Sequence, residues 1–206
     1  MKIIGLRKRT GTQKTGLRKG AETAKKPDTA AGFMTLFFVL GVITGSILNP
    51  VGYGDGIGGI PADTQTAAQI LRVSVMTLLP FAAGLLLLSL FALGWAVTPL
   101  VMAFRGFELG VLFRSLYAAE GLPAGLPYAL ALLPGAAISG AALILMGAGA
   151  LKVSLGLFAA LSRRSIILDM SALLRGFILK FAGLCVVLVG SALIDVLSRK
   201  IYFAVF

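Results

Sequence analysis

Five ionisable side chains interrupt apolar stretches of this 206-residue chain, namely Glu108, Arg114, Lys152, Lys180 and Asp195. A charge at membrane depth is costly, so each of these residues is a candidate functional site. For Lys152, Lys180 and Asp195 we favour snorkelling or pairing near helix ends. Glu108 and Arg114 are the stronger candidates, although six residues apart on a helix they do not face one another. Arg105 and Glu108 are three apart, which is the spacing of an ion pair on one helix.

A proton relay normally uses several acids within the membrane, and the sequence offers one strong candidate, Glu108. An ion pair facing the cytoplasm or lying between helices is therefore favoured. The chain has no His and one Cys. No metal-ligand spacing, phosphate-binding loop, nucleophile–base pair or pair of catalytic carboxylates appears. We expect no metal, no cofactor and no enzymatic activity, and we interpret Cys185 as a small buried apolar side chain.

Small residues recur at the spacing that lets membrane helices approach closely. Gly106 and Gly110 form one small-xxx-small step, directly after Arg105. We expect these positions to pack helices, either within the chain, which we favour, or against a partner or another copy. A second set of such positions follows later in the chain: Pro134, Gly135, Ser139, Gly140, Gly147 and Gly149.

The elements that carry these residues are membrane-spanning helices. Hydrophobic residues make up 58% of the chain, charged residues 13%, and the mean hydropathy is +0.96. Lipid requires each span to satisfy its own backbone hydrogen bonds, and the long apolar runs do not alternate as barrel strands would. The sequence therefore predicts an all-α polytopic membrane protein, with one helical transmembrane domain over 31–206.

Residues 1–30 form a basic segment that we expect to be disordered. Residues 1–28 hold nine basic and two acidic side chains and so contribute +7 to the chain's net charge of +11. The positive-inside rule places this segment in the cytoplasm, and adhesion to anionic lipid is an alternative role. Nucleic-acid binding is disfavoured, because the segment has no aromatic residue for base stacking. It is also too long for the n-region of a secretory signal.

Five crossings are predicted, with one or two short broken or re-entrant helices. The first span covers about 31–48, an outer loop covers 50–64, and a helix from about residue 65 continues through an apolar core at 81–101 to Arg105 at the cytoplasmic surface. Residues 106–121 fit a shallow span, a re-entrant half-helix or an interfacial helix, and a turn follows at 121–127. A half-helix at 127–133 ends at Pro134-Gly135. Further spans cover 136–160 and 177–197, joined by a cytoplasmic link at 163–175. Five crossings put the C-terminus outside, whereas four would keep it inside.

This arrangement resembles the stage II sporulation protein M family over residues 30–200. The resemblance rests on Leu40-Gly41-Val42-Ile43-Thr44-Gly45 in the first span, on the step Arg105, Gly106, Gly110 within 102–111, and on Leu132-Leu133-Pro134 about 25 residues later. Many members of that family carry His or Glu shortly after the Leu-Leu-Pro, where this chain has Gly135, Ala136 and Ala137.

The resemblance implies a membrane scaffold rather than a catalyst. Members of that family sit in the bacterial cytoplasmic membrane at the sporulation septum. There they recruit cell-wall hydrolases, the stage II sporulation proteins D and P, which remodel peptidoglycan during engulfment of the forespore. The alternative prediction is a membrane subunit of a transporter or lipid-handling permease, because discontinuous helices often line transport sites. That alternative predicts that Glu108 and Arg114 face a polar cavity.

Overall fold

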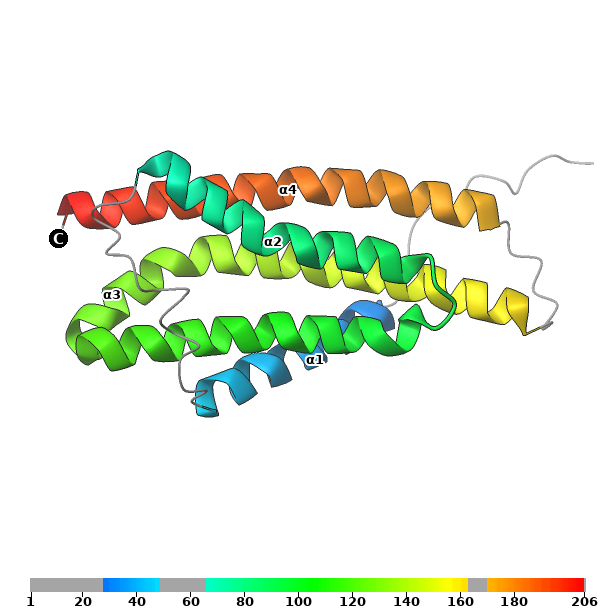
Figure 1. Cartoon of the computed structure of the whole chain (residues 1–206), viewed down its shortest axis with the longest axis horizontal. Helices are drawn as coiled ribbons and strands as arrows, with labels where there is room; N and C mark the ends of the chain where they lie inside the picture. The colour runs from blue at the N-terminus through cyan, green and yellow to red at the C-terminus, as the bar shows by residue number, and fades with distance from the viewer. Residues whose placement is uncertain (1–27, 49–65, 163–169, 206) are drawn as a thin grey trace, which may run out of the picture.

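The protein is a bundle of long helices in a computed structural model that describes residues 28–48, 66–162 and 170–205. The helices are α1 (Thr29–Ile47), α2 (Ala67–Ser89), α3 (Gly94–Leu161) and α4 (Met170–Val205). Helix α3 bends back on itself, so that its two arms run side by side in opposite directions (Figure 1). We call residues 94–118 the first arm and residues 126–161 the second arm.

Five helical segments are long and apolar enough to cross a membrane: Thr29–Ile47, Ala67–Ser89, Gly94–Ala118, Leu126–Leu161 and Ser171–Tyr202. Successive segments run in alternating directions along the bundle (Figure 1). This confirms the prediction of an all-α polytopic membrane protein with about five spans. The basic segment over 1–27, the loop over 49–65 and the link over 163–169 lie outside the described residues.

The second predicted span is wrong in its boundaries. The apolar run was expected to continue as one helix to Arg105, but α2 ends at Ser89 and the chain turns at residues 90–93 before α3 begins at Gly94. The turn consists of Leu, Phe, Ala and Leu, so hydropathy cannot distinguish it from a span. Pro80 is accommodated inside α2 rather than at its end.

Two further expectations are corrected by the continuity of α3. The predicted short element at 106–121 is the larger part of a full first arm, not a re-entrant or interfacial piece. The predicted break at Pro134-Gly135 is absent, since the second arm is helical through both residues. A proline removes one backbone donor, and neighbouring helices in membranes commonly compensate for this loss. Residues 121–127 are helical as well, although α3 turns back in this region (Figure 1).

Helix α1 packs on α3, and glycines on both helices make the approach close. A Cβ added to Gly41 or Gly45 would overlap the carbonyl oxygen of Ala103 or Phe107. A Cβ added to Gly106 or Gly110 would likewise overlap a carbonyl oxygen of α1. Backbones touch directly only where both partners lack side chains, as in small-xxx-small membrane interfaces. The face of Gly106 and Gly110 is therefore occupied from within the chain.

The bundle core lies between α3 and the other helices. Met34, Leu85, Met102, Leu143 and Met146 are all almost completely buried and belong to one apolar cluster. Leucine, valine and phenylalanine side chains on the outside of the bundle remain exposed, which suits helices surrounded by lipid. The polar side chains within this apolar frame are the ones that need an explanation.

Candidate functional site: polar groups within the bundle

The length of α1 gives a scale for depth in the membrane. Its 19 residues span about 28 Å, close to the roughly 30 Å thickness of a hydrocarbon core. Each end of α1 is held by a cation of α3. Lys152 donates to Asp28, which caps the N-terminus of α1, and Arg114 donates to the carbonyl oxygens of Ser46 and Ile47, each at 2.8 Å. These two contacts lie at the two levels where a span of this length meets the headgroups.

Arg114 acts as the C-terminal cap of α1. The last carbonyl oxygens of a helix have no partner within the helix and carry partial negative charge. One guanidinium nitrogen satisfies two of them at once. The transporter alternative predicts that Arg114 faces a polar cavity, whereas in the structure its guanidinium contacts the end of α1.

Arg105 and Glu108 form an ion pair well inside the first arm. Nη1 of Arg105 lies 2.9 Å from a carboxylate oxygen of Glu108, and both side chains are largely buried. Arg105 is nine residues from Arg114, which places it about 13 Å deeper along the helix. The predicted position of Arg105 at the cytoplasmic surface is therefore wrong, because the helix that contains it begins eleven residues earlier, at Gly94.

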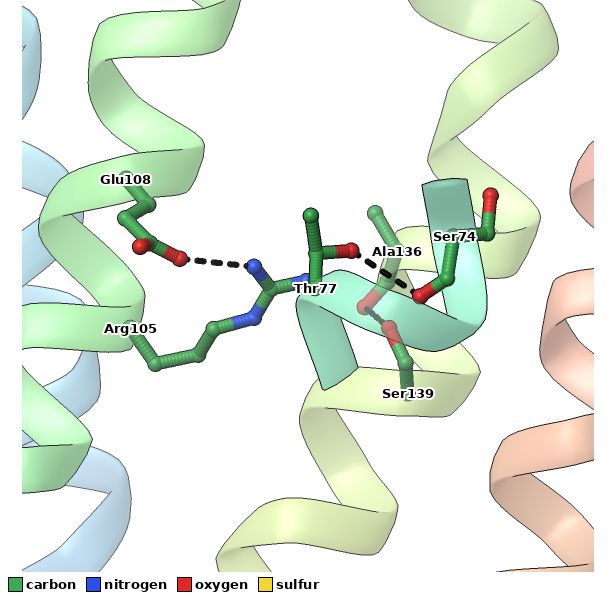
Figure 2. A network of polar contacts seen from close by, with 6 residues as sticks. All are labelled: Ser74, Thr77, Arg105, Glu108, Ala136 and Ser139. Carbon is green, nitrogen blue, oxygen red and sulfur yellow. Dashed lines mark hydrogen bonds and ion pairs between the residues drawn. The ribbon is translucent and has the colours of Figure 1, made fainter. Parts of the chain in front are cut away.

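The guanidinium of Arg105 is directed toward α2. It lies over the ring of Phe81, 5.3 Å from the centroid, and Figure 2 shows it extending from the first arm toward the side of α2 that carries Thr77. A desolvated cation over an aromatic face is stabilised by the ring's electron density. Nε of Arg105 is buried and has no hydrogen-bond partner among the described residues.

Asp195 of α4 supplies a second acid inside the bundle. Its carboxylate lies against the backbone of Gly135, where a Cβ would overlap it. Gly135 is 17 residues from Lys152, about 25 Å along the second arm, so this contact lies nearer the level of Arg114 than that of Lys152. Arg199 follows Asp195 by four residues on α4, which is the spacing of an ion pair on one helix. Gly135 is thus used to admit an acidic side chain from a neighbouring helix.

Polar groups of four helical segments therefore lie inside the bundle. Arg105 and Glu108 come from the first arm, and Asp195 comes from α4. Ser74 of α2 and Ser139 of the second arm are buried as well. The carbonyl oxygen of Ser74 accepts from the hydroxyl of Thr77, and the hydroxyl of Ser139 donates to the carbonyl oxygen of Ala136 (Figure 2). We call these five residues the polar cluster of the bundle. With Arg199 included, its two cations balance its two acids. Loss of the partner of any one of these charges would strongly destabilise the folded protein, because an unpaired charge would remain buried.

The other predicted packing residues lie near this cluster or along α1. Gly140 faces the ring of Phe38 on α1, and Gly147 faces the sulfur of Met102 across the two arms. Pro134 is exposed on the second arm. The structure thus pairs Arg105 with Glu108 and sets Gly135 against Asp195, whereas Arg114 lies at the end of α1.

Sequence reasoning missed three kinds of residue. Gly41 and Gly45 repeat the small-xxx-small spacing of Gly106 and Gly110, and that shared spacing was a usable signal. Asp28 directly precedes an apolar run, as an N-cap does. Ser154, which bonds the turn between α2 and α3, carries no signal at all in the sequence.

Two apolar grooves accompany these groups, and neither is lined by Glu108 or Arg114. One lies between α2 and the first arm, at Pro80, Phe81, Gly84 and neighbouring residues. The other lies between the second arm and α4 and contains Lys152 and Lys180.

Comparison with known proteins finds no family model, no curated protein and no solved structure that matches this chain.

Proposed function

We propose that the chain is an integral membrane scaffold. It would recruit and localise membrane-anchored peptidoglycan hydrolases for septal wall remodelling and engulfment during endospore formation, as its resemblance to the stage II sporulation protein M family implies. The observation that carries the scaffold role is the pairing of Arg105 with Glu108 at 2.9 Å inside the bundle. Glu108, one of the two strongest candidates for chemistry, is thereby paired with a cation of its own helix.

The residues that carry the resemblance support the same role. Gly106 and Gly110 provide the contact surface for α1, and Leu132 is buried in the second arm. These motifs therefore serve the packing of the bundle, which is what a scaffold needs to present a fixed surface. Since Gly106 and Gly110 are already covered by α1, we place the partner contact elsewhere. The segment joining α1 to α2, over residues 50–64, is the first to test.

The decisive experiment is affinity purification of the tagged chain from its native host after crosslinking, in mild detergent, with mass spectrometry of the bound proteins. We expect membrane-anchored peptidoglycan hydrolases resembling stage II sporulation proteins D and P. A matched bait replaces residues 50–64 by a Gly-Ser segment of equal length. Loss of the hydrolases from that bait alone would locate the contact, and their absence from both baits would refute the proposal.

A transporter or lipid-handling subunit is the second candidate function. The observation that favours it is the polar cluster of the bundle, in which Nε of Arg105 is buried and lacks a partner among the described residues. Polar groups at this depth often mark a transport pathway. Recovery of a nucleotide-binding ATPase without hydrolases, in the same purification, would favour this candidate over the scaffold.

A further inference from the structure

A groove of about 640 Å³ lies between the second arm of α3 and the first part of α4 (the yellow and orange ribbons of Figure 1). Its wall is mostly apolar and contains several small residues, which leave room along the helices. Gly176 and Gly183 both line it, and an added Cβ at either position would meet nothing within 4 Å. The apolar wall includes Leu145, Ala148, Val153, Leu173 and Leu184.

The groove also carries charge. Lys152 is occupied by its ion pair with Asp28, and both of these residues line the groove. Lys180 is exposed and, within the part of the chain that the structure describes, forms no hydrogen bond or ion pair. The three groups together leave one positive charge at the groove, which complements the single negative charge of a phosphodiester.

The position of these groups matches the level of the lipid headgroups. Asp28 directly precedes α1, which is only long enough to cross the hydrocarbon core once. Lys152 is bonded to Asp28 and therefore lies at that surface. Lys180 is about 15 Å from the start of α4 and lines the same groove, and a lysine side chain can extend toward the interface from such a position.

We propose that this groove binds an anionic phospholipid, with an acyl chain along its apolar wall and the phosphate at Lys180. The apolar wall favours a lipid over a free anion. A transmembrane helix of a partner would bury Lys180 and would need an acidic side chain at that position to balance its charge. A headgroup phosphate supplies that charge and leaves the lysine in the hydrated interface. This site goes beyond the proposed scaffold role and does not depend on it.

The test uses the full chain in neutral detergent micelles with equal amounts of phosphatidylglycerol and phosphatidylcholine of the same acyl chains. Native mass spectrometry counts the lipids that remain bound. We expect wild type to retain phosphatidylglycerol preferentially. Lys180→Gln should lower its retention about fivefold, since one basic residue near the surface contributes about that factor, and should leave phosphatidylcholine unchanged. Excess inorganic phosphate should not displace the lipid.

A second pair of variants tests the groove itself. Gly183→Leu fills open space in the groove and should lower the retention of both lipids. Gly190→Leu is the matched control, because Gly190 lies on the same helix with equally open space but does not line the groove. It should bind as wild type does. Circular dichroism and size exclusion would establish that each variant is folded. If Gly183→Leu does not fold, the lipid retention of Lys180→Gln tests the proposal by itself.

Three results would overturn the proposal. Equal retention of the two lipids by wild type would indicate unselective annular lipid. Displacement of phosphatidylglycerol by inorganic phosphate would indicate a free-anion site. Loss of a co-purifying membrane protein from Gly183→Leu, with lipid retention unchanged, would assign the groove to a partner helix instead.

Discussion

The guanidinium of Arg114 lies 2.8 Å from the carbonyl oxygen of Ile47, a residue 67 positions earlier in the chain. The same nitrogen reaches the carbonyl oxygen of Ser46. At the opposite end of α1, Lys152 reaches Asp28. The two arms of α3 thus hold the two ends of the first span, and the glycine contacts hold its middle. This is a route by which one bent helix fixes the position of another.

Replacing Arg114 by Ala should destabilise the protein by about 1–2 kcal/mol. The variant leaves two terminal carbonyls of α1 without their donor and removes a cation from the negative end of the helix. Thermal unfolding in detergent, followed by the fluorescence of Trp95, the only tryptophan, measures the effect. Arg175→Ala is the control, because Arg175 is an exposed cation with no polar contact within the described ranges. An equal effect of both substitutions would contradict a capping role for Arg114.

Substitution of Gly106 by Leu should separate α1 from α3. Its side chain would have to displace the backbone of α1 at Phe38, and overpacking of this kind costs about 1–3 kcal/mol or more. Gly84→Leu provides the comparison, since an added Cβ at Gly84 meets nothing within 4 Å. We expect a lowered unfolding temperature for the first variant only. Equal temperatures for both variants would show that the close approach of the helices is not required.

The ion pair inside the first arm makes a prediction about coupling. Arg105→Met alone leaves the carboxylate of Glu108 unpaired at depth, and breaking a buried pair in this way typically costs about 3–5 kcal/mol. The double variant Arg105→Met, Glu108→Gln removes both charges and should recover most of the loss. A double-mutant cycle of unfolding free energies measures the coupling. Additive effects of the two substitutions would mean that the pair contributes nothing as a pair.

The sequence was a good guide to the helical class and a poor guide to the boundaries inside apolar runs. Lipid-exposed helices need no amphipathic pattern, so the turn at residues 90–93 looks like any other part of a span. Among the site residues, spacing alone placed Arg105 beside Glu108. It could not place Asp195 against Gly135, because that contact joins helices 60 residues apart. The roles of Arg114 and Ser154 likewise depend on partners that are distant in the chain.

Ser154 holds the apolar turn between α2 and α3. Its hydroxyl accepts from the backbone N–H of Trp95 at 2.8 Å and donates to the carbonyl oxygen of Phe91 at 2.7 Å, and the side chain is fully buried. Ser154→Ala should cost about 1–3 kcal/mol, because it leaves the backbone N–H of Trp95 unpaired in apolar surroundings, whereas the carbonyl oxygen of Phe91 keeps its bond from Gly94. The measurement is again the unfolding temperature in detergent.

Ser191 offers the matched control for Ser154. It is also almost fully buried, but among the described residues its hydroxyl bonds only to the carbonyl oxygen of Leu188 on its own helix. Ser191→Ala should therefore have a small effect. The fluorescence of Trp95 should shift in Ser154→Ala and stay unchanged in Ser191→Ala, since the indole adjoins the bonded amide. A similar cost for both variants would remove any special role of Ser154 in the turn.

The Asp28–Lys152 pair predicts a dependence of stability on pH. The hydrogen bond from Lys152 lowers the pKa of the Asp28 carboxyl below its ordinary value of about 3.9. A carboxyl with a lower pKa in the folded state stabilises that state above the unfolded pKa, and this contribution is lost as the pH falls through the folded pKa. Wild type should thus exceed Asp28→Asn in stability at pH 7, by less than about 1 kcal/mol for so exposed a pair.

The comparison with Asn isolates the charge, because Asn caps a helix about as well as Asp does. Unfolding temperatures of wild type and Asp28→Asn, measured in detergent from pH 7 to pH 3, should converge below about pH 4. Asp28→Ala should be less stable than both at pH 7, because it also loses the bond from the backbone N–H of Ala30. A gap between wild type and Asn that stays constant over this range would show that the carboxylate charge does not hold the start of α1 on Lys152.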